Sequence, residues 1–165
     1  MSKPDIIIVN EDDKEIGFKS RAEVDPSKDI YRCTALWLSN SKGQVLVAKR
    51  ARTKSVDPDK WGPAVSGTVE RGETYSSNIY KEAKEEIGLE DVEFEVGLKL
   101  YERSPRNYFV QWFSVVLDRD AADFSLQKDE VAEVAWLDAA FIIEDIRKNP
   151  DKYIPAMSQV IGFFK

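Results

Sequence analysis

Apolar residues recur along this chain with two periods, which separate expected strands from expected helices. The runs Ile6 to Val9 and Glu15 to Phe18 flank an acidic turn and predict a hairpin at the N-terminus. Further β-rich runs predict strands at Thr34 to Leu38, Val45 to Ala48, Ala64 to Val69, Val92 to Tyr101, Tyr108 to Leu117 and Val131 to Leu137. Most of the regular structure is therefore expected to be sheet.

Helical spacing appears in three segments. The first, residues 75–87, has an apolar stripe made of Tyr75, Ile79, Ala83 and Ile87. Thr74 is placed to cap its start and Gly88 to end it. Two more helices are expected at Phe141 to Arg147 and Ile154 to Phe164, separated by Asn149 and Pro150. The pattern predicts an α+β fold with helices flanking a mixed sheet.

The length of 165 residues corresponds to a single domain spanning 1–165. Hydrophobic residues make up 42% and charged residues 33%, as in an ordinary globular protein. No segment approaches the run of about 20 apolar residues that spans a bilayer, so no membrane association is expected. Cys33 is the single cysteine and cannot form an internal disulfide, which favours a reducing, cytoplasmic location.

The net charge and the lack of histidine limit the partners and the catalytic sites that this chain could have. The 24 basic and 30 acidic residues give a net charge of −6, which argues against nucleic-acid polymers as partners but leaves small anions open. The chain contains no histidine, so a Ser-His-Asp triad, a Cys-His dyad and a histidine-ligated zinc site are excluded. Catalysis has to use carboxylates, lysines or hydroxyl groups.

Three carboxylates crowd one face of the helix at residues 75–87. Glu82, Glu85 and Glu86 fall within an arc of about 100°, next to the apolar stripe rather than opposite to it. A solvated acidic face would place them opposite the stripe, where Lys81 and Lys84 stand instead. Because like charges at this spacing repel, a cation is expected to offset them, and Mg²⁺ or alternatively Mn²⁺ prefers carboxylate oxygens.

The loop from Arg50 to Trp61 is rich in cations, and loops of this kind often contact ligands.

For some other residues a structural role is the simpler interpretation. Tyr101, Tyr108 and Trp112 are available to stack on a nucleobase, but core packing is the commoner role of such aromatics. Arg106 is expected to be a solvated loop arginine.

The segment Gly67–Leu89 resembles the Nudix box, G-x5-E-x7-R-E-U-x-E-E-x-G-U, in which U is aliphatic. The matching positions are Gly67, Glu73, Glu82, Ala83, Glu85, Glu86, Gly88 and Leu89. Lys81 stands where the family has arginine, which keeps the charge and loses the planar fork. The resemblance implies an α/β/α sandwich around a mixed sheet.

The same resemblance implies roles for the box residues. The carboxylates of Glu82, Glu85 and Glu86, with the carbonyl group of Gly67, would hold one or more divalent cations. Glu73 and Lys81 would brace the helix, which Gly88 ends.

The segment Val45–Trp61, together with the N-terminal hairpin, resembles the Nudix branch of type I isopentenyl-diphosphate isomerases and their hydrolase relatives. By this resemblance, Arg50 and Lys54 would contact the diphosphate of a substrate. The isomerases need a cysteine and a histidine in the segment that is Ala64 to Thr68 here, where Ser66 and Thr68 stand instead. Hydrolysis is therefore expected rather than isomerisation.

The expected activity is Mg²⁺-dependent hydrolysis of a diphosphate linkage in a small-molecule nucleoside diphosphate derivative, by attack of a metal-activated water on phosphorus. Nudix enzymes take their general base from the box or from a later loop. Glu82 represents the box, and Glu130 is favoured over Asp129 and Glu133 in the loop before the last strand. The alternatives are isomerase-like chemistry on prenyl diphosphates and a non-catalytic nucleotide-binding module. In each case the protein is expected to be a monomer or a homodimer.

Overall fold

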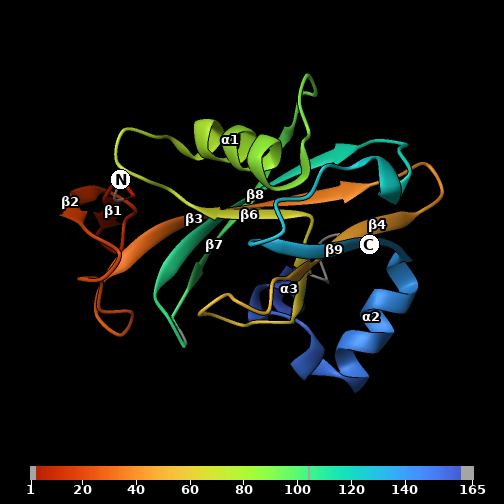
Figure 1. Ribbon diagram of the computed structural model, residues 1–165. Coiled ribbons are helices and arrows are strands. Elements are labelled where there is room, and N and C mark those ends of the chain that lie inside the picture. Colours follow the sequence, from red (N-terminus) through yellow and green to blue (C-terminus); the bar gives the residue numbers. More distant parts are fainter. Residues whose placement is uncertain (1–2, 104, 161–165) are drawn as a thin grey trace.

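The computed structural model describes residues 3–103 and 105–160. In chain order the elements are β1 (Ile6–Val9), β2 (Glu15–Lys19), β3 (Ile30–Ser39), β4 (Gln44–Arg50), β5 (Trp61–Pro63), β6 (Val65–Thr68), α1 (Tyr75–Ile87), β7 (Glu95–Glu102), β8 (Tyr108–Val116), η1 (Ala121–Asp123), β9 (Val131–Asp138), α2 (Ala139–Lys148), η2 (Pro150–Lys152) and α3 (Pro155–Val160). Helix α1 covers one face of the sheet, and α2 and α3 cover the other (Figure 1).

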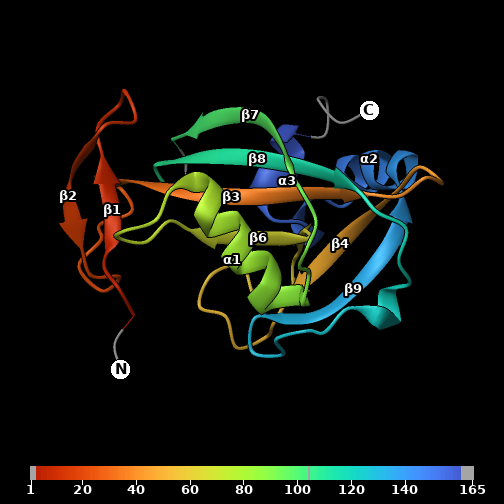
Figure 2. The ribbon, with the colours of Figure 1, turned by 90° about the horizontal axis from the view of Figure 1, so that it is seen from above.

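The sheet is mixed and is organised around β3. This strand runs parallel to β8 and antiparallel to β6, and β7 pairs with the outer side of β8. Strand β4 lies between β5 and β9, and a single pair, Ser39 with Val45, joins it to β3. The hairpin of β1 and β2 pairs with the start of β3 and extends from one end of the sheet, as seen from above in Figure 2.

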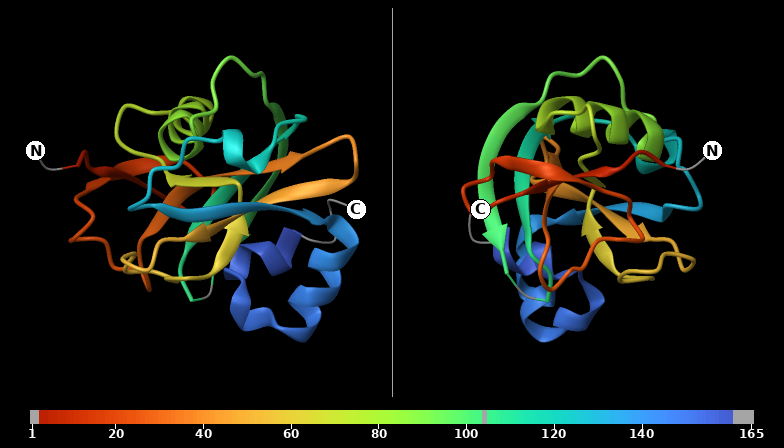
Figure 3. Two further views of the ribbon diagram at one scale, coloured as in Figure 1. Left: turned by 45° about the vertical axis from the view of Figure 1, so that its right-hand side comes forward. Right: turned by 90° about the vertical axis from the view of Figure 1, so that its left-hand side faces the viewer.

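Alternate side chains of β3 belong to the two hydrophobic cores on opposite faces of the sheet. Ala35 and Trp37 pack toward α2 and α3, whereas Leu36 and Leu38 pack toward α1. Successive side chains of a strand point to opposite faces, so one strand can contribute to two cores. Figure 3 shows the resulting α/β/α sandwich from two further sides. The expected α+β fold, with a mixed sheet and an N-terminal hairpin, is confirmed.

Helix α1 has the expected bounds and the expected caps. The Thr74 side chain accepts a hydrogen bond from the Ser77 N–H, and the Ser77 hydroxyl accepts one from the Thr74 N–H, which forms a capping box. Gly88 ends the helix at φ 68°, a left-handed conformation that glycine adopts without a steric cost. Three residues of the predicted stripe, Ile79, Ala83 and Ile87, are fully buried under the sheet. This packing fixes which face of α1 reaches the strands.

Several boundaries differ from the sequence-based expectations. Strand β3 starts at Ile30 because its first two residues, Ile30 and Tyr31, pair with Val9 and Ile8 of β1. Strand β5 was not expected, since Gly62 and Pro63 disfavour strands. Strand β7 starts at Glu95 rather than Val92, since Phe94 packs in the core and its N–H donates to the Tyr80 hydroxyl. Helix α3 starts at Pro155, and residues 161–164 of the expected helix lie outside the described residues.

Among the described residues, no helix has both the length and the apolar character needed to cross a bilayer.

Candidate active site

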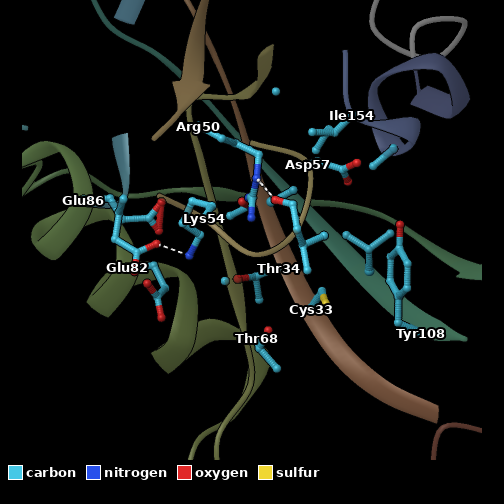
Figure 4. A pocket seen from close by; sticks show the side chains of 18 of the residues that line it. Cys33, Thr34, Arg50, Lys54, Asp57, Thr68, Glu82, Glu86, Tyr108 and Ile154 are labelled. Atoms are coloured by element: carbon cyan, nitrogen blue, oxygen red, sulfur yellow. Dashed lines mark hydrogen bonds and ion pairs between the residues drawn. The ribbon is translucent and has the colours of Figure 1, made fainter. Parts of the chain in front are cut away.

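A cavity of about 670 Å³ lies where α1 faces the ends of β3, β4 and β6. Its wall on the α1 side carries the glutamates of the helix, and Tyr108 of β8 stands at the opposite side (Figure 4). Arg50 and Lys54, from the end of β4 and the loop that follows, line the cavity between them. The structure thus brings together acidic and basic residues that are far apart in the sequence.

The three helix glutamates differ in burial. Glu86 is buried, with 7% of its surface exposed, and Glu82 is half-buried, whereas Glu85 is exposed at the cavity rim. Burial raises the pKa of Glu86, and the negative charge of the neighbouring Glu82 carboxylate raises it further. The pKa of Glu82 is also raised, chiefly by burial. Each of the two carboxyl groups therefore binds a proton more readily than an ordinary glutamate does.

Gly67 lies against the Glu82 side chain of α1, and it faces Thr34 in the β3–β6 pairing. A Cβ atom at this position would stand 2.8 Å from Cδ of Glu82 and 3.0 Å from Oδ1 of Asn78. Such distances leave no room for a side chain, so the backbone itself contacts the helix. The backbone of the neighbouring Ser66 favours the ionised form of Glu86 and so partly opposes the rise in its pKa.

The donor set fits a hard divalent cation. Within residues 3–103 and 105–160, no group of three or more Asp, Glu, Cys or His side chains forms a complete metal site. One buried and one half-buried carboxyl group beside a backbone segment nevertheless suit Mg²⁺, because this ion usually takes one or two carboxylates, retains waters and binds further oxygens of substrate phosphates. A cation here would favour the ionised form of both Glu82 and Glu86.

The two predicted phosphate-binding residues are held differently. Nε of Arg50 donates to the Val56 carbonyl group at 2.9 Å, which holds the guanidinium against its own loop. The Lys54 ammonium group forms an ion pair with the Glu130 carboxylate. The Ala51 N–H donates to the carbonyl oxygen of Glu130 at 3.0 Å, so backbone contact also joins the two loops.

Of the three carboxylates considered as an outside base, only Glu130 lines the cavity. Asp129 is exposed in the same loop, and Glu133 pairs with Lys49 in the β4–β9 register, also with its side chain exposed. The negative charge of Glu130 contributes to the raised pKa of Glu86. Glu130 is thus close enough to the helix glutamates for their charges to interact.

The Glu73 and Lys81 side chains form an ion pair. The Lys81 ammonium group also donates to Glu70 at 2.6 Å and lies 3.7 Å from Glu82. Burial alone would lower the pKa of Lys81, but the hydrogen bonds to Glu70 and Glu73 raise it above its ordinary value. Lys81 is therefore a permanent cation behind the glutamate face.

Sequence reasoning missed several residues at this site. Asn78 is fully buried behind Gly67. At about 100° per residue it lies on the helix between Glu82 and Glu85, and this position in the sequence was the signal that could have identified it as a site residue. Tyr31 and Cys33 line the cavity from β3, and Arg106 lines it instead of being a purely solvated arginine.

The three aromatic residues considered as stacking partners for a nucleobase lie in different environments. Trp112 is fully buried in the core, and Tyr101 stacks on Phe109 at 4.5 Å between ring centroids. Tyr108 lines the cavity and stacks on Tyr31 at 5.7 Å. Core packing was thus the correct interpretation for Trp112, while Tyr108 is available to a ligand.

The sequence matches the NUDIX domain family over residues 31–157. It is 31% identical to the uncharacterized Nudix hydrolase PA4841 of Pseudomonas aeruginosa, over 94% of this chain and 90% of that protein. It is 29% identical to a prenyl-diphosphate phosphatase of Methanosarcina mazei, over 95% and 93% of the two chains. The crystal structure of DR0079 from Deinococcus radiodurans is similar in fold, with a TM-score of 0.84 at 21% identity over 96% of this chain and 98% of that chain. The chain therefore belongs to the Nudix family and is a Nudix hydrolase.

Proposed function

We propose that this Nudix hydrolase is a Mg²⁺-dependent pyrophosphohydrolase that cleaves the diphosphate linkage of a small molecule, with a nucleoside diphosphate derivative as the first candidate. One observation carries the proposal: the carboxyl groups of buried Glu86 and half-buried Glu82 line the same cavity as Arg50 and Lys54. The acidic side suits a divalent cation and the basic side suits phosphate oxygens. A diphosphate needs both at once.

Each residue then has a distinct role. Arg50 and Lys54 bind phosphate oxygens and stabilise the charge that develops on the departing phosphate. Glu130, released from Lys54, accepts the proton of the attacking water, and Glu82 is the alternative base within the helix. The cation that Glu82, Glu85, Glu86 and the Gly67 carbonyl group would hold supplies neutralisation of the diphosphate and a lowered pKa for water.

Mg²⁺ is the proposed cation, with Mn²⁺ as a substitute. The proposed ligands are all oxygen atoms, which Mg²⁺ and Mn²⁺ prefer. The chain has no histidine, and Cys33 lies on β3 rather than on α1, so no nitrogen or thiolate ligand accompanies the glutamates.

The part of the cavity away from the glutamates would receive the organic group of the substrate. The stacked rings of Tyr31 and Tyr108 offer a surface for a nucleobase. A prenyl diphosphate is the second candidate, since Val110, Ile154 and Ala156 also line the cavity. The similarity to the Methanosarcina mazei prenyl-diphosphate phosphatase supports the same alternative.

Hydrolysis is favoured over isomerisation of a prenyl diphosphate. Ser66 and Thr68 replace the cysteine and histidine that the isomerases need in this segment. Cys33 lies opposite Thr68 in the β3–β6 register, but burial raises the pKa of its thiol to about 12. A protonated thiol with no histidine in the chain does not provide the acid and base of that reaction.

The test is a panel of nucleoside diphosphates and triphosphates, nucleotide sugars, dinucleoside polyphosphates and prenyl diphosphates, incubated with Mg²⁺. Released phosphate and organic products are measured for the wild type, Glu86→Gln and Glu90→Gln. Glu90 is the matched control, because it is exposed and pairs with Lys84 just beyond α1.

We expect Mg²⁺-dependent cleavage that Glu86→Gln abolishes and Glu90→Gln retains. Product analysis distinguishes hydrolysis from isomerisation, and the preferred compound distinguishes the two substrate classes. If no compound is cleaved while nucleotides still raise the melting temperature, the protein is a binding module and the proposal is wrong.

A further inference from the structure

Asn78 is a fully buried amide in the first turn of α1, one turn before Glu82. Its Nδ2 group donates to the Thr68 carbonyl oxygen at 3.0 Å and to Oε2 of Glu73 at 2.6 Å. Its Oδ1 accepts a hydrogen bond from the Thr34 hydroxyl. Both partners of Nδ2 are pure acceptors, so the orientation of the amide is fixed by chemistry.

Glu73 is therefore held by two different donors. Lys81 contacts Oε1 and Asn78 donates to Oε2. An arginine at position 81 could hold both oxygens with one planar fork, whereas the lysine ammonium group is a single centre that also serves Glu70. Asn78 supplies the second donor that a guanidinium group would provide.

The same amide holds the backbone around Gly67. Thr68 follows Gly67 in β6, and Thr34 faces Gly67 across the β3–β6 pairing. Asn78 thus bonds to the residue after Gly67 and to the residue paired with it. Because Oδ1 of Asn78 lies 3.0 Å from where a Gly67 side chain would begin, the amide and Glu82 together set the separation between this backbone and α1.

We propose that Asn78 is a positioning residue for the cation site, and that it compensates for lysine at position 81 by completing the hold on Glu73. The inference rests on the proposed metal-dependent function, because the atoms that Asn78 positions are the Gly67 backbone and the α1 carboxylates. Loss of its three hydrogen bonds would let β6 move relative to Glu82 and Glu86. Cation affinity would fall although Asn78 itself touches no cation.

The test measures Mn²⁺ affinity directly, by the electron paramagnetic resonance signal of free Mn²⁺, and so does not depend on knowing the substrate. The variants are Asn78→Ala, Lys81→Arg and the double variant, with Glu86→Gln as the ligand control. Ile79→Val is the stability control, since this neighbour is equally buried but packs only in the core. Circular dichroism checks folding, and Asn78→Ser replaces Asn78→Ala if the latter does not fold.

We expect Asn78→Ala to weaken Mn²⁺ binding by about 10-fold or more, as is usual when groups that orient metal ligands are removed. When Lys81→Arg is combined with Asn78→Ala, part of that loss should be recovered, because the guanidinium fork takes both oxygens of Glu73 but does not replace the hydrogen bonds to Thr68 and Thr34. Ile79→Val should bind Mn²⁺ as the wild type does. If Asn78→Ala binds normally, or Lys81→Arg gives no recovery, the inference is wrong. If the wild type and Glu86→Gln bind Mn²⁺ equally, the metal site itself is refuted.

Discussion

The ammonium group of Lys54 and the carboxylate of Glu130 form an ion pair although 76 residues separate them in the chain. About a quarter of each side chain is exposed, and both line the cavity beside the α1 glutamates. In the proposed mechanism one of these groups binds phosphate and the other accepts a proton from water. In that mechanism, a substrate phosphate that drew Lys54 away would free Glu130 to accept the proton. Substrate binding would then be linked to activation of the base.

The first prediction concerns Glu130. Glu130→Gln keeps the shape of the side chain but removes its capacity to accept a proton. We expect kcat to fall by about 100-fold or more, as for loss of a general base, with a much smaller effect on Mn²⁺ affinity. Asp129→Asn is the control, because Asp129 is exposed in the same loop and does not line the cavity. Unchanged turnover at saturating Mg²⁺ would reject Glu130 as the base.

The second prediction concerns Lys54. We expect Lys54→Met to raise KM roughly 10-fold, since a hydrogen bond to a charged group contributes about 1.5 kcal/mol. Arg52→Met removes a cation from the same loop, but the Arg52 side chain is 87% exposed and pairs with Asp59. Steady-state kinetics on the preferred compound compares the two variants. Equal changes in KM would mean that only the overall charge of the loop matters.

Local sequence signals predicted the parts of the site that depend on one element. Thr74, Gly88 and the apolar stripe determine α1, and the helical period places Glu82 and Glu86 beside the core. The pairing of Lys54 with Glu130 could not be predicted, because it depends on how β4 and β9 align in the sheet. Strand β5 was missed for a similar reason: Gly62 and Pro63 are strand residues only because β4 is beside them.

The third prediction concerns the close approach at Gly67. A Cβ atom in Gly67→Ala would overlap Glu82, so either the side chain of Glu82 or the backbone has to move. We expect Mn²⁺ affinity and kcat to fall together, while the variant stays folded by circular dichroism. Gly17→Ala in β2 is the control, since a Cβ atom there meets nothing within 4 Å. If Gly67→Ala bound Mn²⁺ as the wild type does, the backbone at Gly67 would have no part in the site.

The fourth prediction concerns Asp13, which joins the N-terminal hairpin to the rest of the fold. Its carboxylate accepts hydrogen bonds from Nε of Arg32 at 2.7 Å, from Nζ of Lys99 at 2.7 Å and from the Tyr75 hydroxyl at 2.9 Å. Burial opposes ionisation of Asp13, but the hydrogen bonds from Lys99, Arg32 and Tyr75 outweigh it and lower its pKa below the ordinary 3.8. The ionised form is therefore stabilised by folding.

Asp13→Asn tests this directly, because asparagine tolerates the φ of 59° at this position and the backbone is not strained by the change. At pH 7 we expect the free energy of unfolding to fall by about 2 kcal/mol, as for loss of hydrogen bonds to a charged group. A lowered pKa stabilises the fold above the unfolded-state pKa, and this contribution is lost as the pH falls through the folded-state pKa. The difference between wild type and variant should therefore be constant from pH 7 to about 5 and shrink below about 4. Urea unfolding across this pH range measures the difference in the free energy of unfolding. Asp12→Asn is the control, because Asp12 is exposed. A difference that persisted at the lowest pH would show that Asp13 acts through packing rather than through its charge.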